Sequence, residues 1–443
     1  MLKIRIPRLP TAVLLRRVAL TYLIVWVLSP PLAYGAIWRV LAVLAMLLWL
    51  ALDTLAPRSV LRKPNWPVLG MVVFVLYSAF IEGLVPDSAG INQQFQIWIM
   101  LFFLLVGESH RRGRSDEAKF CFWVVLIVLP VWELATLWGI STIAADVSRT
   151  ISRSSQEARE LAGQGIGGFN FIYVVVLCLP FLAYLVFRPV SRKGRGQQQS
   201  RWQRRIIRLL IICNFVLSIL VVIRAGYSIA LILSAFAILS VLLVRSRRSI
   251  PLAMSLCLVG LLVLTAAIAL QPALRALQGA TSGTEYSAKV RDIQASLEDE
   301  KSTGSVEGRT ERYIRSVHGF IENPVLGTLT FDEVGKHSAI LDRFAQYGLG
   351  FGLLFLALLI HVPLRVARSS QVPIGLALAF LIVAVGFPLL NPVFMSWGLI
   401  LFVFSRGAFA FMGIAFKTNG RDEASEEPES MRAADPSSLS GPR

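Results

Sequence analysis

Residues 209–223, LLIICNFVLSILVVI, and residues 225–244, AGYSIALILSAFAILSVLLV, are two apolar runs separated by the single charge of Arg224. Neither run contains a charged residue. A helix that crosses the hydrocarbon core of a bilayer needs about 20 mostly apolar residues. Backbone polar groups in hydrocarbon must be paired within the segment, which favours a helix over irregular chain. The two runs therefore predict two membrane-spanning helices with Arg224 at the turn between them.

The same pattern recurs from one end of the chain to the other. The predicted spans are 18–36, 37–55, 67–86, 95–107, 119–140, 169–187, 209–223, 225–244, 251–271, 347–364, 372–389 and 393–411. The fourth span is short, and we expect it to extend upstream. The basic start of the chain and the apolar run after it are expected to remain as the first helix. The prediction is an all-α polytopic membrane protein of about twelve transmembrane helices.

Composition excludes the main alternatives to a membrane protein. The chain has 443 residues, of which 55% are hydrophobic and only 16% are charged. Soluble domains usually carry about 25% charged residues, so a soluble globular enzyme is excluded. Disorder over most of the length is also excluded, because disordered segments have low hydrophobicity.

The net charge of +17 could indicate nucleic-acid binding, but its distribution fits a membrane topology. With an internal N-terminus, the internal connections and tail hold 29 basic and nine acidic residues. The external connections hold 12 basic and 16 acidic residues. Membrane proteins concentrate Lys and Arg in their short internal loops. We therefore place both termini inside and expect no nucleic-acid partner.

Only one connection is long, and it lies on the outer side. The predicted organisation is helices 1–9 in residues 1–271, a large outer loop in 272–346, helices 10–12 in 347–416 and a disordered internal tail in 417–443. Within the loop, residues 309–323 place apolar side chains at three- and four-residue spacing, which is typical of an amphipathic helix. A long loop in a compact protein is usually functional or disordered.

Three polar residues on the outer side are candidates for chemistry. Arg224 lies at the predicted outer membrane face, where a guanidinium can bind a phosphate or can extend to the lipid head groups. Arg309 begins the loop helix, where free N–H groups and a cation would together favour an anion. His337 precedes the tenth span and is the side chain best suited to exchange a proton near neutral pH, although a lone histidine is more often structural.

Neither a metal site nor a cofactor is predicted. The four cysteines, Cys121, Cys178, Cys213 and Cys257, lie in apolar spans and have no nearby Cys or His in the sequence. Small buried side chains are the expected role of such cysteines. The Gly163–Gly168 segment, GQGIGG, is not preceded by a strand, so we interpret it as a connection and not as a phosphate loop.

The stretches GRTERYIRSVHGFIENPVLG and KHSAILDRFAQYGLGFGLLFLALL resemble the signature of the O-antigen polymerase and O-antigen ligase superfamily. The matching positions are Arg309, Tyr313, the turn Asn323–Gly327, His337 and the Gly348–Gly350 segment. The layout of twelve spans with a large outer loop before the tenth also resembles this superfamily. Arg224 resembles an arginine element of the family at the start of the eighth span.

The resemblance implies an integral-membrane glycosyltransferase that acts at the periplasmic face of a bacterial inner membrane. It would polymerise polyprenyl-diphosphate-linked oligosaccharide repeat units, as in O-antigen or exopolysaccharide synthesis, without a metal. His337 would be the general base, and Arg224 and Arg309 would hold the diphosphate. The further candidates for binding substrate are Tyr313, Arg312 and Asp342, although a solvated helix face is the simpler interpretation of Arg312.

Several alternatives remain open at the level of the sequence. The sibling activity is an O-antigen ligase, which transfers glycan to a lipid A core. A second alternative is a transporter of lipid-linked glycans, although few charges lie deep in the spans, Glu133 being the main one. A third is a membrane scaffold whose loop binds a partner. The expected partners are the glycan donor, the acceptor, the lipid bilayer and a chain-length regulator.

The topology gives a first testable prediction. In a cysteine-free background, a cysteine at position 200 should be protected from a membrane-impermeant thiol reagent in cells with a permeable outer membrane. A cysteine at position 302 should react. Labelling of position 200 from outside would contradict the orientation and every residue placed on the outer side.

Overall fold

The architecture is that of a computed structural model, which describes residues 11–33, 35–56, 58–85, 88–143, 147, 151, 156–188, 201–243 and 307–414. The described residues form helices and connections without any β-strand, so the predicted all-α fold class is confirmed. The predicted ninth span (251–271), most of the 272–346 loop and the 417–443 tail lie outside the described residues.

The helices follow the apolar runs. In chain order they are α1 (Thr11–Leu28), α2 (Pro30–Ala33), α3 (Ala36–Thr54), α4 (Trp66–Leu84), α5 (Ser88–Arg111), α6 (Ser115–Thr142), α8 (Gln156–Gly163), α9 (Phe169–Phe187), α10 (Arg201–Ala225), α11 (Ser228–Leu243), α14 (Glu307–Glu322), α15 (Ala339–Ala367), α16 (Ile374–Leu390), α17 (Met395–Gly398), the π-helical turn η1 (Leu399–Phe404) and α18 (Ser405–Phe411). Eleven of the twelve predicted spans overlap these helices.

Seven of the described helices are long and apolar enough to cross a membrane, namely α1, α3, α4, α6, α9, α10 and α15. Three shorter apolar helices, Ile229–Leu243, Ile374–Leu390 and Met395–Phe411, coincide with further predicted spans. The fourth predicted span lies within α5, which extends upstream to Ser88 and downstream to Arg111. The total of twelve spans remains a prediction.

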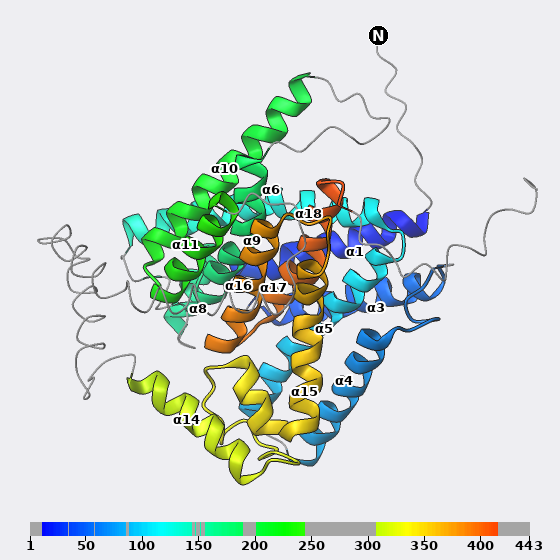
Figure 1. Ribbon diagram of the computed structural model, residues 1–443, viewed down its shortest axis with the longest axis vertical. Helices are drawn as coiled ribbons and strands as arrows, with labels where there is room; N and C mark the ends of the chain where they lie inside the picture. The colour runs from blue at the N-terminus through cyan, green and yellow to red at the C-terminus, as the bar shows by residue number, and fades with distance from the viewer. Residues whose placement is uncertain are drawn as a thin grey trace, which may run out of the picture.

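Helix α9 forms the centre of the bundle. Its apolar window is 78% buried, whereas that of α3 is only 22% buried. In the described part of the chain, α9 packs against α10, α11 and α16. Figure 1 shows this group of helices next to one another, with α14 and the start of α15 at the opposite edge of the view. The outward face of α3 is covered with exposed leucine and valine side chains, as expected for a surface that meets lipid.

Two predicted boundaries differ from the structure. The first apolar span, predicted as 18–36, is a helix that begins at Thr11 and ends at Leu28. Prolines 30 and 31 cannot continue it, because proline lacks an N–H donor and its ring clashes with the preceding turn. Helix α15 begins at Ala339, inside the predicted loop, because Ser338 caps it by accepting a hydrogen bond from Leu341 N at 3.1 Å.

The α1, α3 and α5 helices each connect two polar regions at opposite ends of the bundle. Arg39 and Asp53 stand 14 residues apart in α3, and Gln96 and Glu108 stand 12 residues apart in α5. At 1.5 Å per helical residue, these separations are about 20 Å. Segments that the charge pattern assigns to the inner side meet at one end, and segments assigned to the outer side meet at the other. Which membrane face each end occupies remains a prediction.

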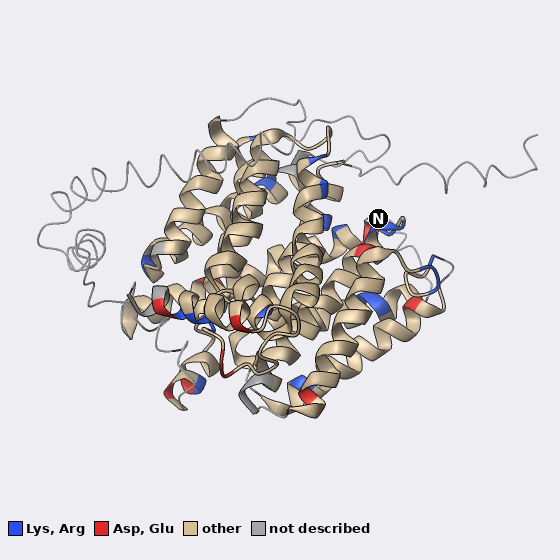
Figure 2. Ribbon diagram, turned by 60° about the horizontal axis from the view of Figure 1, so that its bottom comes forward, with Lys and Arg blue, Asp and Glu red and all other residues tan. Residues whose placement is uncertain are grey.

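The inner end is held together by buried ion pairs. Glu108, only 1% exposed, accepts hydrogen bonds from Asn65 Nδ2 at 2.6 Å, Arg111 Nε at 2.8 Å and Arg365 Nη1 at 3.1 Å. These contacts join α4, α5 and α15. Figure 2 shows how few Lys, Arg, Asp and Glu residues interrupt the remaining helices. Charges removed from water need such partners, which explains why they gather in one network.

Helix α15 bends sharply at Gly348, where the loop turn packs against it. Gly348 has φ of 69° and ψ of −172°, a conformation that side chains rarely adopt. The bend allows Leu349 N to donate to Pro324 O at 2.8 Å. Next to it, Leu329 N donates to Gln346 O at 2.9 Å. The turn that ends α14 is therefore attached to the bend in α15 through backbone hydrogen bonds.

The bend gives a prediction about stability. A Cβ at position 348 would collide with the carbonyl of Val325, and the positive φ adds strain of about 1–3 kcal/mol. We expect Gly348→Ala to lower the unfolding midpoint of the purified protein by several degrees. Gly350→Ala is the matched control, because no atom lies within 4 Å of a Cβ there and alanine favours a helix. Equal midpoints for the two variants would contradict this account of the bend.

Candidate functional site

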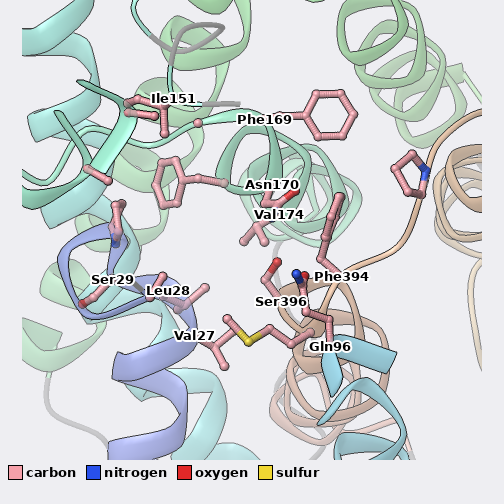
Figure 3. Close-up of a pocket in the computed structure, with 18 of the residues that line it drawn as sticks. Val27, Leu28, Ser29, Gln96, Ile151, Phe169, Asn170, Val174, Phe394 and Ser396 are labelled. Carbon is pink, nitrogen blue, oxygen red and sulfur yellow. The ribbon is translucent and has the colours of Figure 1, made fainter. Parts of the chain in front are cut away.

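A cavity of about 760 Å³ lies at the end of the bundle that the charge pattern assigns to the outer side, called the outer end below. Its walls come from the ends of α1, α3, α5, α8 and α9 and from the two connections that precede α15 and α17. Figure 3 shows Val27 and Leu28 of α1 facing Asn170 and Val174 of α9 across this space, with Ser396 between them. The cavity is thus formed by loops and helix ends of the bundle. Ligand sites in helical proteins often lie between helices in this way.

The charged residues that line the cavity are all basic. They are Arg39 of α3, Arg159 of α8 and Lys336 of the loop before α15. His337 lines the same wall, and no Asp or Glu is among the described lining residues. Guanidinium and ammonium groups around a concave surface attract anions and can bind phosphate oxygens directly. The cavity is therefore suited to an anionic ligand.

The contacts of His337 select one form of its ring. Its Nδ1 lies 2.9 Å from Lys336 O, which can only accept a hydrogen bond. The Arg312 guanidinium lies against the ring, with its Nη1 at 3.1 Å from Nε2 and 3.5 Å from Nδ1. Because the carbonyl needs a donor, the proton of the neutral ring lies on Nδ1 and the lone pair on Nε2. That is the form of histidine that can accept a proton.

The segment before His337 is held in an unusual conformation. Lys336 has φ of 62°, which is uncommon for a residue other than glycine and often marks a functional site. Gly335 packs so closely on the carbonyl of Arg312 that a Cβ would collide with it. The Gly335 N–H also donates to Ser316 Oγ at 2.9 Å. The loop is thus pressed against α14, which brings His337 beside Arg312.

Asp342 fixes this loop to both flanking helices. Its Oδ1 accepts from Ser316 Oγ of α14 at 2.7 Å, and its Oδ2 accepts from Ser338 N at 3.2 Å. Asp342 is only 3% exposed and does not line the cavity. Because Ser338 directly follows His337, the carboxylate positions the histidine backbone. Asp342 is therefore a positioning residue in this geometry.

Two further polar side chains on the cavity wall have buried atoms without a hydrogen-bond partner among the described residues. They are Ser29 Oγ and Asn391 Nδ2, on residues that are 1% and 3% exposed. A buried polar atom without a partner costs about 1–3 kcal/mol unless a ligand or water satisfies it. Both atoms could be satisfied by hydroxyl or phosphate groups of a ligand in the cavity.

The arrangement offers anion binding beside a proton acceptor. No group of three His, Cys, Asp or Glu side chains that could hold a metal ion occurs in the described ranges. The aromatic side chains of Phe169 and Phe394 also lie on the cavity wall, with ring centroids 6.2 Å apart. Aromatic faces provide large apolar contact surfaces for the ring of a ligand.

Comparison with known families finds one match. The family model of the O-antigen ligase domain matches residues 213–332. This match places residues 213–332 in the O-antigen ligase and polymerase superfamily. Members are glycosyltransferase-like membrane enzymes that act on lipid-linked glycans. No curated protein and no solved structure matches the chain.

The matched residues include the predicted site residues of α10 and α14. It includes Arg224, Arg309, Arg312 and Tyr313, and it ends five residues before His337. The Tyr313 hydroxyl donates to Leu390 O at 2.8 Å and so attaches α14 to the end of α16. The structure thus places Arg312 in contact with His337 and gives Tyr313 a structural bond, and the roles of these residues in chemistry remain predictions.

Two predicted arginines are not placed beside His337. Arg224 is exposed at the last turn of α10 and does not line the cavity. It is three residues from Tyr227, whose ring packs against Phe169 with centroids 5.6 Å apart, so it lies at the same end of the bundle. Arg309 belongs to α14, but its side chain lies outside the described residues.

Sequence reasoning missed Arg39 and Arg159. Arg39 lies within the predicted span 37–55, and Arg159 lies in the outer connection between the fifth and sixth predicted spans. A signal for Arg39 was present, because it lies near the outer end of its predicted span, as does Arg224. No sequence signal distinguished Arg159, since its position on the cavity depends on how α8 packs against α2.

The role of Asp342 can be tested through the loop that it holds. Asp342→Ala should remove both acceptor bonds and lower the rate of glycan transfer by about tenfold to a hundredfold, with a smaller loss for Asp342→Asn, which retains one oxygen acceptor. Glu333→Ala is the control, because Glu333 is exposed in the same loop. Transfer rates are measured at saturating donor. A loss in the control equal to that of Asp342→Ala would contradict the positioning role.

Proposed function

We propose that the protein is a glycan polymerase that joins polyprenyl-diphosphate-linked oligosaccharide repeat units at the periplasmic face of a bacterial inner membrane. The observation that carries this proposal is His337, held with its Nε2 lone pair beside Arg312 on the wall of a basic cavity. A base next to an anion site is what sugar transfer from a diphosphate requires. The membership in the superfamily supports the same class of reaction.

The proposed step transfers one glycan without a metal or cofactor. The acceptor sugar hydroxyl attacks the anomeric carbon of the donor, and its proton passes to His337 Nε2. A new C–O glycosidic bond forms as the anomeric C–O bond to the diphosphate breaks. The electron pair of the broken bond stays on the diphosphate oxygen. The diphosphate is a good leaving group, so the step needs no second carboxylic acid of the glycosidase type.

The basic residues would stabilise the charge that develops on the diphosphate. The cavity is lined by Arg39, Arg159 and Lys336. The superfamily resemblance adds Arg224 and Arg309, which are also predicted to lie on the outer side. Fixed positive groups aimed at a developing negative charge are usually the largest contribution to catalysis. Asn391 Nδ2 would donate a further hydrogen bond to the substrate.

Arg312 would have two partners during the reaction. Without substrate its Nη1 lies 3.1 Å from His337 Nε2, the atom that must receive the proton. The acceptor hydroxyl must take this place beside Nε2, which releases the guanidinium for the diphosphate. The exposed side chain of Arg312 leaves it room for that change. Arg312 would therefore contact His337 before binding and stabilise the leaving group afterwards.

The sibling reaction is the second candidate, because the matching family model is described as an O-antigen ligase. A ligase would use the same donor and the same base but would transfer the glycan to a lipid A core. The distinction depends on which acceptor reaches the cavity. The location of both termini on the cytoplasmic side and a chain-length regulator as partner belong to the polymerase proposal.

The central prediction concerns His337. The full chain is reconstituted in liposomes with a polyprenyl-diphosphate repeat unit, and glycan products are separated by size. His337→Ala should lower the transfer rate by about a hundredfold or more, the usual contribution of a positioned base. Donor binding should change little, because the arginines that hold the diphosphate remain.

His318→Ala is the matched control. His318 lies on the exposed face of α14, pairs with Glu322 at 3.2 Å and has no contact with the cavity. Its variant should transfer glycan at the wild-type rate. A lengthened lipid-linked chain identifies a polymerase, and glycan on an added lipid A core identifies a ligase. Full transfer by the His337 variant, or transport of donor without a new glycosidic bond, would contradict the proposal.

A further inference from the structure

A second cavity, of about 400 Å³, lies at the opposite end of the bundle. We propose that it binds the phosphate of an anionic phospholipid from the inner leaflet, and that this lipid stabilises the bundle independently of glycan transfer. The cavity is formed where the start of α1 meets the end of α3 and the connections that follow α3 and α5. None of its residues lines the cavity that contains His337.

Four arginines line this second cavity, and no Asp or Glu is among the described lining residues. They are Arg16, Arg58, Arg112 and Arg114. Four guanidinium groups around one space repel one another unless an anion lies among them. Arginine is the residue best matched to phosphate, because its planar fork can donate two parallel hydrogen bonds.

Two of the arginines form ion pairs with buried carboxylates. Arg16 Nε donates to Glu117 Oε2 at 3.1 Å, and Arg114 Nη1 donates to Asp53 Oδ1. Asp53 also accepts from Ser59 Oγ at 2.9 Å, so it is part of a rigid network. The carboxylates neutralise two of the four positive charges and hold these guanidinium groups in place. Positive charge remains on the cavity side.

One nitrogen at the cavity has no partner of its own. Arg114 Nη2 is buried and lacks a hydrogen-bond acceptor among the described residues. Arg58 is exposed, and its Nη1 occupies the space beside Gly113, where a Cβ would lie only 2.7 Å away. A phosphate oxygen would satisfy Arg114 Nη2 and lie within reach of the Arg58 guanidinium.

The remaining walls favour a lipid over a soluble phosphate. Ala12, Val13, Leu52 and Leu55 complete the lining, and Leu55 is 73% exposed at the end of α3. These side chains continue into the exposed apolar face of α3, which faces the bilayer if the helix spans it. An acyl chain could follow that face while its phosphate occupies the arginine cluster. Basic groups beside a membrane helix attract anionic lipids in this way.

Lipid binding to the purified full chain in neutral detergent tests the proposal. Mixed micelles containing phosphatidylglycerol, phosphatidylcholine or no lipid are titrated, with inorganic phosphate as a separate arm, and the unfolding midpoint is read. Phosphatidylglycerol should raise the midpoint, and the other additions should not. Arg58→Ala should weaken the apparent affinity for phosphatidylglycerol about tenfold, the loss expected for one charge-assisted hydrogen bond.

Two further variants make the result specific to the cavity. Arg62→Ala is the control, because Arg62 is exposed in the same connection and does not line the cavity, and it should change the affinity less than about twofold. Leu55→Glu, which adds a negative charge at the exposed rim, should weaken binding as Arg58→Ala does.

Equal stabilisation by phosphatidylcholine would overturn the proposal. So would equal losses in the Arg58 and Arg62 variants, since these would indicate general surface charge. An equal effect of inorganic phosphate would identify a soluble phosphate and overturn the lipid assignment. Glycan transfer is not used as a readout, so failure here is distinguishable from failure of the proposed enzyme activity.

Discussion

The hydrogen bonds of one buried carboxylate determine how the outer site is assembled. Asp342 joins Ser316 of α14 to Ser338 at the start of α15, at 2.7 and 3.2 Å. The loop that carries His337 also contacts α14 through the Gly335 N–H bond to Ser316 Oγ and through Arg312, but among the described residues only Asp342 joins α14 to the start of α15 through one side chain. A charge that is almost fully removed from water is stable only when it has such partners. The site therefore depends on a bond that lies outside the cavity itself.

The bend at Gly348 acts together with this carboxylate. The bend gives the first nine residues of α15 a direction different from that of the rest of the helix. The turn that follows α14 forms backbone hydrogen bonds with α15 at this bend. The part of the outer loop described here is thereby fixed at two places, at the bend and at Asp342. A rigid attachment of this kind is what a base needs if it is to remain within reach of a bound hydroxyl.

The sequence was sufficient for the helices but only in part for the site. Apolar runs of about 20 residues mark spans directly, so the helix at 169–187 was predicted with its observed bounds, and α10 was predicted as the span 209–223 within its observed range of 201–225. His337 and Arg312 were also found in the sequence, but their contact depends on a positive φ at Lys336 that no pattern indicates. Arg39 and Arg159 became visible only when α3 and α8 were placed around one cavity. Local periodicity does not determine which helix ends meet.

The two cavities divide the basic residues of the chain into groups with different surroundings. At the inner end, Arg16 and Arg114 each pair with a buried carboxylate, whereas Arg39 and Arg159 at the outer end have no carboxylate partner among the described residues. The central claim is that the outer cavity binds the donor diphosphate beside His337. A cryo-electron microscopy structure of the full chain with a polyprenyl-diphosphate glycan tests this most directly. The account predicts the diphosphate among Arg39, Arg159 and Arg312, with the anomeric carbon facing His337. A diphosphate bound in the inner cavity, or bound away from His337, would contradict it.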